Sequence, residues 1–359
     1  MIRVGIDAHT VGREATGNER FTVELASALA ARDDVDVLAY VDRGTSWPAD
    51  ALPAPRLAEL RLGRPQLRIP IELPARARRD HLDLLQVAYV APPISPVPLV
   101  TVVHDLSFED EPDLYPRRMR LRLQATVRRA ARRSAAVVTG SDFTRGRLIE
   151  RYGLPPERVH RVRYGVAGGW RPMAASEAAG LLLELDLPER FILAVGTAAP
   201  RKNLDRLVEA VGNLRTVEAD LAVVLAGPAP SAANQPWIHR LGYVSDDVLR
   251  ALYSTANAVA YVSLYEGFGL PVLEALACGA VVVASSTTAV SESGGDAVVG
   301  VEPSSVDSIT SGLRRALDDD ALRDQLRANA AAHLAQFTWT RCAEGMVDVY
   351  RAALRRPAG

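Results

Sequence analysis

The sequence predicts an α/β fold made of two doubly wound, Rossmann-like domains. The chain has 359 residues, which at roughly 150 residues per domain suggests about two domains. Short β-branched runs alternate with helix-length runs along the whole chain, and the strand-like runs are apolar at odd and even positions alike. This pattern is typical of parallel sheets that carry helices on both faces.

In the first half, the expected strands lie at 4–8, 37–41, 84–88, 99–104, 136–139 and 159–163, and the expected helices at 18–31, 116–134 and 144–152. In the second half, they lie at 191–195, 222–226, 238–241, 258–261 and 280–284, with a weaker strand at 297–301, and the helices at 204–214, 246–255, 270–278, 306–317 and 321–337.

The boundary between the halves follows from composition. Residues 165–190 are rich in Gly, Pro and Ala and contain one short helix, as expected of a hinge. We therefore expect domains at 1–165 and 166–338, with a last helix in 339–359 that crosses back to the first domain. Two such open sheets place the carboxyl ends of their strands at a shared cleft, where ligands bind.

Composition excludes several classes of protein. Hydrophobic residues make up 48% and charged residues 24%, unlike a disordered, collagen-like or disulfide-dense chain. The formal net charge of -1 gives no global attraction to nucleic acid. Cys278 and Cys342 cannot build a disulfide framework, and the first residues lack an export signal. No apolar run reaches the ~20 residues of a membrane-spanning helix. A reduced, cytoplasmic location is the expectation.

Basic residues gather in one expected helix. Residues 1–165 hold 26 arginines against 21 acidic residues. The excess lies in Arg117, Arg118, Arg120, Arg122, Arg128, Arg129, Arg132 and Arg133. Met119, Leu123, Val127 and Ala130 or Ala131 fall at helical spacing on the opposite side. Two interpretations stay open: a solvated helix face, or a surface for anionic headgroups or an anionic acceptor. The second would give a transient, peripheral contact with the inner face of a membrane.

The most informative motif is the stretch YEGFGLPVLEALACG at 265–279. A strand ends before it, a glycine-bearing loop follows, and Pro271 and Gly279 mark the beginning and end of a helix. The backbone N–H groups of residues 267–270 should point outward at the helix N-terminus, which favours anions. Glu266 and Glu274 flank this terminus and suit hydrogen bonds from sugar hydroxyls. The alternatives are a solvated loop for Glu266 and compensation of the helix dipole for Glu274.

A second motif is VGTAAPRKNL at 195–204. A strand runs into a turn at Gly196, followed by two cations and by Asn203 as an N-cap. Lys202 is the only lysine among 42 basic residues, either by chance in an arginine-biased chain or because this position needs a compact ammonium. Arg201 can bind two phosphate oxygens, and together the cations can neutralise a leaving diphosphate. The alternative is two solvated cations before a helix.

Two weaker features lie in the first half. His104 and Asp105 follow an apolar strand, where the histidine can donate to a sugar hydroxyl or only cap a turn. Asp105 is expected to cap the turn after it. The loop over 10–18 holds Gly12 and Gly17 before a helix and offers backbone amides to a phosphate, although it is no GxGxxG fingerprint.

These pieces together resemble the retaining glycosyltransferases of family 4, which have the GT-B fold. The resemblance covers nearly the whole chain and rests on Glu-x7-Glu at Glu266 and Glu274, on Arg201-Lys202-Asn203, on VVHDLSF around His104, and on SESGGDA at 291–297. One departure is the first loop, where Gly17 is followed by Asn18-Glu19-Arg20 rather than by a further glycine.

The resemblance implies transfer of a hexose from a nucleotide diphosphate sugar, without a metal or other cofactor, to a glycan or lipid-linked acceptor. It implies that residues 1–165 form the acceptor-side domain and residues 166–338 the nucleotide-sugar-binding domain. His104, Arg201, Lys202 and Glu266 would be the catalytic residues. The donor would be bound by Gly17, Gly196, Arg201, Lys202, Tyr243, Val244, Glu266, Gly267, Phe268, Gly269, Leu270 and Glu274. The HDLSF wording resembles mannosyltransferases of polysaccharide or glycolipid assembly and favours GDP-mannose over a UDP-sugar. A GT-B sugar-nucleotide epimerase and a non-catalytic nucleotide-sugar-binding subunit remain the competing readings.

Overall fold

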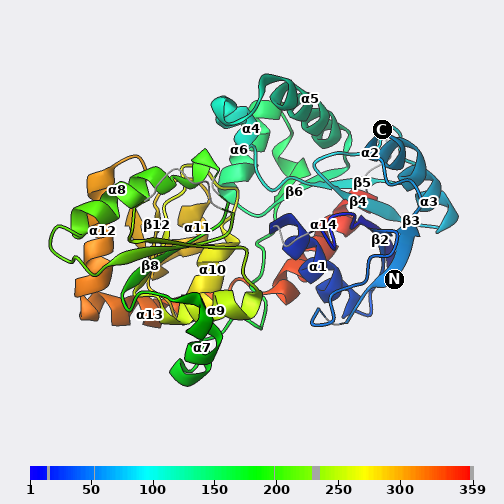
Figure 1. Ribbon diagram of the computed structural model, residues 1–359. Helices are drawn as coiled ribbons and strands as arrows, with labels where there is room; N and C mark the ends of the chain where they lie inside the picture. The colour runs from blue at the N-terminus through cyan, green and yellow to red at the C-terminus, as the bar shows by residue number, and fades with distance from the viewer. Residues whose placement is uncertain (14–16, 52, 198, 229–234, 356–359) are drawn as a thin grey trace. The chain divides into compact units, whose positions relative to one another are not determined.

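The computed structural model describes residues 1–13, 17–51, 53–197, 199–228 and 235–355, and the chain divides into two compact units (Figure 1). The first unit comprises 1–165 together with 338–359, and the second comprises 166–337. The last helix, α14 (Trp339–Leu354), packs against α1 (Gly17–Ala30) of the first unit. Among the described residues, no helix has both the length and the apolar character needed to cross a membrane.

The first unit is built on a seven-stranded sheet in the order β3-β2-β1-β4-β5-β6-β7, with every pair parallel. Its strands are β1 (Ile2–Asp7), β2 (Val35–Asp42), β3 (Arg56–Leu60), β4 (Leu84–Ala88), β5 (Leu99–Val102), β6 (Ala136–Thr139) and β7 (Val159–Arg161). Its other helices are α2 (Pro65–Leu67), the π-helical turn η1 (Arg68–Glu72), α3 (Leu73–Arg79), α4 (Ser107–Asp110), η2 (Pro112–Leu114), α5 (Arg117–Arg133), α6 (Asp142–Tyr152) and η3 (Pro156–Arg158).

The second unit is built on a six-stranded parallel sheet in the order β10-β9-β8-β11-β12-β13. Its strands are β8 (Phe191–Val195), β9 (Ala222–Ala226), β10 (Ile238–Gly242), β11 (Ala258–Tyr261), β12 (Val282–Ser285) and β13 (Val299–Val301). Its helices are α7 (Ala175–Leu182), η4 (Leu183–Leu185), η5 (Pro200–Lys202), α8 (Leu204–Leu214), α9 (Asp246–Thr255), α10 (Leu270–Ala277), α11 (Val290–Gly294), η6 (Gly295–Ala297), α12 (Val306–Asp318) and α13 (Asp320–Leu334).

Both faces of each sheet are buried, as the apolar runs predict. In β8, Phe191 and Leu193 join a core under α9 and α10, whereas Ile192 and Ala194 join a core under α8 and α12. In β2 of the first unit, Leu38 and Tyr40 likewise alternate with other residues that face the opposite core. The predicted α/β fold of two parallel, doubly wound sheets is therefore confirmed.

Two elements of the first unit were not predicted, and one expectation was wrong. Strand β3 was not expected, because as an edge strand it exposes Arg56, Leu57 and Glu59 and lacks an apolar run. The helical stretch from α2 to α3 was also not predicted; Pro65 and Pro74 lie in its first turns, where proline is tolerated. Met119 was expected on the buried side of α5, yet its exposed fraction is 50%.

Two helical glycines of the second unit give a matched stability prediction. A Cβ at Gly312 in α12 would approach Val301 Cγ1 to 2.3 Å, whereas one at Gly212 in α8 would meet nothing within 4 Å. We expect G312A to lower the free energy of unfolding by about 1–3 kcal/mol through overpacking. We expect G212A to raise it by about 0.5–1 kcal/mol through helix propensity. Urea unfolding of both variants measures this, and equal effects would contradict the packing.

Candidate active site

The candidate site forms where the order of strands reverses in the second sheet. The neighbours β8 and β11 lie at its centre; the chain leaves β8 toward β9 on one side and leaves β11 toward β12 on the other. At such a switch point the two following loops diverge and leave a crevice at the carboxyl ends of the strands. Residues 196–203 follow β8 and residues 262–269 follow β11, so both predicted motifs reach this edge.

Hydrogen bonds join these two loops. The backbone N–H of Leu264 donates to the carbonyl oxygen of Arg201 at 2.7 Å. The buried side-chain amide of Asn203 donates to the carbonyl oxygens of Val262 at 3.0 Å and Pro303 at 2.6 Å. Asn203 adopts a left-handed conformation, with φ of 60°, and makes no side-chain cap bond to α8. Asn203 therefore takes the expected N-cap position of α8, but its side-chain amide fixes the turn to the neighbouring loops instead of capping the helix.

Arg201 and Lys202 converge on one buried carboxylate. Glu266 Oε1 lies 2.7 Å from Arg201 Nη1 and 2.8 Å from Lys202 Nζ. Burial alone would raise the pKa of Glu266, but the charges of Lys202 and Arg201 hold it below its usual value. Burial, assisted by neighbouring Arg201, lowers the pKa of Lys202 despite the opposing attraction of Glu266. Because these three side chains pair with one another and Glu266 is buried, the alternatives of two solvated cations and a solvated Glu266 are wrong.

Tyr261 is a member of this site that sequence reasoning missed. Its hydroxyl accepts a hydrogen bond from Lys202 Nζ at 2.8 Å, and its ring centroid lies 4.4 Å from the same nitrogen. The only sequence signal was its place as the last residue of an expected strand, because the end of a strand at a switch point faces the crevice. Tyr261 thus positions the ammonium of Lys202 beside Glu266.

Glycine permits close contact around Lys202. Gly196 has a φ of 129°, and a Cβ there would lie 3.1 Å from Lys202 Cε. A Cβ on Gly227 would approach the carbonyl oxygen of Gly196 to 2.4 Å. Gly227 also has a positive φ, of 123°. Both positions therefore require glycine by conformation and by the closeness of their neighbours. Ala198 of the same motif lies outside the described residues.

The beginning of α10 supplies the expected amide-rich turn. Gly269 takes the N-cap position with a φ of 106°, and Leu270 begins the helix. A Cβ on Gly269 would meet Ser293 Oγ at 2.8 Å, so α11 packs tightly against this turn. Phe268 is buried, and the centroid of its ring lies 6.0 Å from the ring centroid of Phe337. Gly267 precedes Phe268 in the same loop. The buried side chain of Phe268 therefore anchors the backbone of this loop.

Glu274 lies buried in α10 and acts electrostatically on Tyr261. Burial, followed by the charge of Glu266, raises the pKa of Tyr261, and Glu274 adds to that rise.

Tyr243 and Val244 follow β10 at the same edge of the sheet; Tyr243 is 65% exposed, whereas Val244 packs on the core. Gly227 N–H donates to the carbonyl oxygen of Gly242 at 2.7 Å and so ties the ends of β9 and β10 together.

His104 and Gly17 belong to the first unit. His104 Nδ1 lies 2.9 Å from the hydroxyl of Tyr164, and its ring contacts Phe21 with centroids 4.8 Å apart. Nε2 is buried and has no hydrogen-bond partner among the described residues. His104 is therefore not a fully satisfied capping residue. Gly17 is the first residue of α1, and the neighbouring loop residues 14–16 lie outside the described part of the chain.

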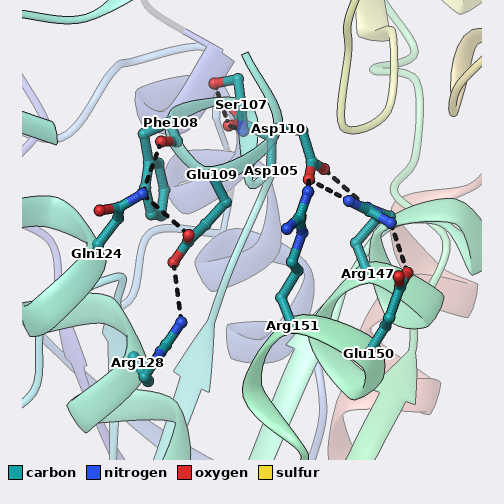
Figure 2. A network of polar contacts seen from close by, with 10 residues as sticks. All are labelled: Asp105, Ser107, Phe108, Glu109, Asp110, Gln124, Arg128, Arg147, Glu150 and Arg151. Carbon is teal, nitrogen blue, oxygen red and sulfur yellow. Dashed lines mark hydrogen bonds and ion pairs between the residues drawn. The ribbon is translucent and has the colours of Figure 1, made fainter. Parts of the chain in front are cut away.

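Asp105 follows the expected capping role. Its Oδ1 accepts from the backbone N–H of Ser107 at 2.9 Å and from the Ser107 hydroxyl at 2.7 Å, where α4 begins (Figure 2). This turn orients the chain that leaves His104.

His104 gives a prediction for stability against pH. Burial lowers its pKa from 6.5 to about 4, against the opposing charge of Asp105. Between these values the unfolded chain binds a proton that the folded chain does not, so the free energy of unfolding falls as the pH falls. The loss reaches up to about 3 kcal/mol below pH 4.

We expect H104N to show a smaller loss of stability between pH 7 and 4, measured by urea unfolding. H81N, at an exposed turn, is the control and keeps the wild-type dependence. Identical pH profiles for H104N and the wild type would contradict the assignment.

Comparison with known proteins covers both units. The family description "Glycosyltransferase Family 4" matches residues 15–167, and "Glycosyl transferases group 1" matches residues 183–333. O-antigen chain mannosyltransferase B of Escherichia coli is 30% identical over 266 residues, which cover 70% of this chain and 70% of that protein. D-inositol 3-phosphate glycosyltransferase of Salinispora arenicola (strain CNS-205) is 32% identical over 317 residues, covering 76% of this chain and 69% of that protein.

The fold has solved relatives of the same architecture. The structure of sucrose-phosphate synthase from Thermosynechococcus elongatus superposes with a TM-score of 0.78 at 19% identity, covering 98% of each chain. This agreement confirms the GT-B fold. Together with the family matches, it confirms the resemblance stated from the motifs: the chain belongs to the group 1 and family 4 glycosyltransferases and is a glycosyltransferase.

Proposed function

We propose that this glycosyltransferase transfers a hexose, with mannose favoured, from a nucleoside diphosphate sugar to a glycan or lipid-linked acceptor with retention of anomeric configuration. The observation that carries the proposal is the convergence of Arg201 and Lys202 on buried Glu266 at the switch point of the second sheet. Two cations that share one carboxylate leave a net positive charge in a buried setting. A donor diphosphate is the group that this charge suits.

Each site residue has a role in the proposed donor complex. Arg201 and Lys202 stabilise the negative charge on the leaving diphosphate, with Tyr261 holding the ammonium in place. Gly196 and the backbone of Gly267, Phe268, Gly269 and Leu270 line the phosphates and the sugar. Glu266 accepts hydrogen bonds from sugar hydroxyls, and Glu274 accepts those of the ribose. Tyr243 and Val244 flank the base through their backbone, Gly17 contributes to phosphate binding, and His104 donates to the transferred sugar.

The proposed mechanism needs no metal ion, because two cations and a helix N-terminus offset the charge of the diphosphate. Departure of the nucleotide leaves an oxocarbenium-like sugar. The acceptor hydroxyl attacks on the face that the leaving group vacates, and a phosphate oxygen of the leaving nucleotide takes the hydroxyl proton. The new glycosidic bond thus replaces the broken bond to the diphosphate on the same face. Positioning and charge stabilisation supply most of the rate.

The donor and the setting are part of the proposal. The name of the Escherichia coli relative states an O-antigen chain and mannose, which supports GDP-mannose as the donor and polysaccharide or glycolipid assembly as the process. A UDP-sugar is the alternative donor. We propose a cytoplasmic enzyme with transient contact between α5 and an anionic membrane, since that helix carries eight arginines.

A thermal-shift screen tests the donor. We expect GDP, among GDP, UDP, ADP and dTDP, to raise the melting temperature selectively, because a ligand at 100 times its Kd stabilises the fold by about 2.7 kcal/mol. E274A should weaken that shift and raise the donor KM. No response to any nucleotide would overturn the proposal. A response to UDP alone would assign a UDP-sugar as the donor in place of GDP-mannose.

Turnover of variants tests the cation site. K202A should lower kcat by ~10²-fold or more, the scale of removing one preorganised stabiliser. Y261F should lower it by roughly tenfold, the rate equivalent of a hydrogen bond to a charged group. K202R keeps the charge but replaces the compact ammonium by a planar group, so it should recover little. Unchanged turnover in K202A would remove Lys202 from the diphosphate site.

Product analysis separates the competing readings. Transfer to an acceptor, with the anomeric configuration read by nuclear magnetic resonance, supports a retaining transferase. Conversion of the nucleotide sugar without an acceptor indicates an epimerase, and nucleotide binding without any product indicates a non-catalytic subunit. Full activity in the presence of a chelator supports the metal-independent mechanism.

A further inference from the structure

The motif SESGGDA at 291–297 touches the proposed donor site without belonging to it. It folds into α11 and the 3₁₀ turn η6. Helix α11 packs against α10, and η6 packs against α13. The motif therefore joins two elements of the second unit: the helix that begins at residues 267–270, called the donor turn from here on, and α13.

The first contact with the donor turn is made by Ser293 of α11, whose side chain is fully buried. A Cβ on Gly269 would lie 2.8 Å from Ser293 Oγ and 3.8 Å from Tyr261 Cε1. The Ser293 hydroxyl donates to the carbonyl oxygen of Val290 at 3.1 Å, which fixes the side chain within its own helix. Ser293 thus limits the movement of the donor turn toward α11.

The second contact is made by Phe268, the residue before Gly269. Its ring packs on that of Phe337, which is buried and follows α13. The carbonyl oxygen of Phe337 accepts from the backbone N–H of Val166 at 3.0 Å. Val166 and Phe337 are the first and last residues of the second unit. The donor turn is therefore connected to the place where the chain enters and leaves that unit.

His333, in the last turn of α13, links the two contacts. Its Nε2 lies 2.7 Å from the carbonyl oxygen of Ser293, and because a carbonyl oxygen only accepts, Nε2 carries a proton and donates. The ring centroids of His333 and Phe337 lie 4.8 Å apart. A closed cycle of contacts within the second unit results, formed by Gly269, Ser293, His333, Phe337 and Phe268.

The backbone of the motif leaves room for the imidazole ring. Gly295 has a φ of 51°, and a Cβ there would approach His333 Cε1 to 2.7 Å and Nδ1 to 2.9 Å. The positive φ and the close approach both require glycine at this position. His333 itself is only half-buried, so it adds less to the core than a fully buried side chain. Its close packing therefore indicates a role in fixing the position of its neighbours.

A second hydrogen bond joins α13 to the same motif. The side-chain amide of Asn329 donates to the carbonyl oxygen of Asp296 at 2.9 Å. Asn329 lies four residues before His333 on the same helix. Asn329 binds η6, whereas His333 binds α11, the element that meets Gly269. The two side chains therefore separate general anchoring of the motif from positioning of the donor turn.

We propose that His333 is a positioning residue of the donor site, which holds the donor turn in its binding geometry through the hydrogen bond to Ser293. The contact with Phe337 orients the ring that donates. The inference rests on the proposed function, which assigns this turn to the phosphates and the sugar. A turn that is fixed before the donor arrives loses little conformational entropy on binding. A released turn must be ordered by the donor, and part of the binding free energy is then lost.

Two variants of His333 and one control test the proposal. H333A removes the donor to Ser293, and H333Q restores an N–H donor on a side chain without a ring. N329A removes the hydrogen bond from α13 to Asp296 and is the matched control. The melting temperature of each variant is measured first, and the other measurements are made well below the lowest value. Where H333A does not fold, H333L, which fills more of the space without a donor, takes its place.

Calorimetry measures the effect on donor binding. The probe is GDP-mannose, or UDP-glucose where the thermal-shift screen selects UDP. We expect H333A to raise the Kd by about tenfold, the scale of one lost hydrogen bond. H333Q should recover most of the wild-type affinity, because it restores the bond to Ser293. N329A should bind as the wild type does.

Hydrogen exchange of the backbone amides of residues 267–270 measures the turn itself in the ligand-free protein. We expect H333A to speed this exchange by about tenfold, because local opening becomes easier when a contact of the turn is removed. H333Q and N329A should exchange at nearly the wild-type rate. This readout follows the donor turn alone and does not require a donor.

Three results would overturn the proposal. The first is wild-type exchange at 267–270 in H333A together with an unchanged Kd. The second is an equal effect of H333A and N329A, which would make His333 a general anchor of the motif. The third is a failure of H333Q to restore either readout. A wild type that binds neither nucleotide sugar would instead reject the proposed function, and the exchange measurement would still decide the role of His333.

Discussion

The parallel pairing of β8 with β11 is the constraint on which the donor site depends. Their register ends with Ala194 beside Ala260, so the chain leaves both strands at the same height. The loops that follow then place Arg201 and Lys202 opposite Glu266, residues more than sixty positions apart. The hydrophobic faces of the sheet hold this register, because a slip by one residue would exchange the two cores that alternate along β8. Packing in the core is thus what gives the charged cluster its geometry.

Glu266 compensates the charge of the site in the ligand-free protein. Two partly buried cations without a counter-ion would be costly, and one carboxylate shared between them reduces that cost. Tyr261 completes the arrangement through the ammonium of Lys202. In the proposed donor complex, the diphosphate provides negative charge on the open side of the cations. Glu266 is then available to sugar hydroxyls without leaving the cluster.

Much of this architecture could be predicted from the sequence, and the reasons for the gaps are physical. Strands such as Phe191–Val195 are recognisable because both of their faces are apolar. Arg201, Lys202 and Glu266 stand in motifs that carry their own turn residues. Strand β3 was not predicted because an edge strand needs few apolar residues. The burial of Arg68 was not predicted because, in the sequence, a buried arginine looks the same as a surface arginine; contacts with distant strands bury it. The roles of Tyr261 and Asn203 depend equally on contacts distant in sequence.

The chain's sole lysine has a chemical consequence. Lys202 carries the one ε-amino group of the polypeptide; its side chain is 10% exposed, and the ammonium lies between a carboxylate and a phenol ring. A reagent directed at primary amines therefore has a single side chain to modify besides the α-amino group, and the adduct at Lys202 would report on whether this site is free or occupied.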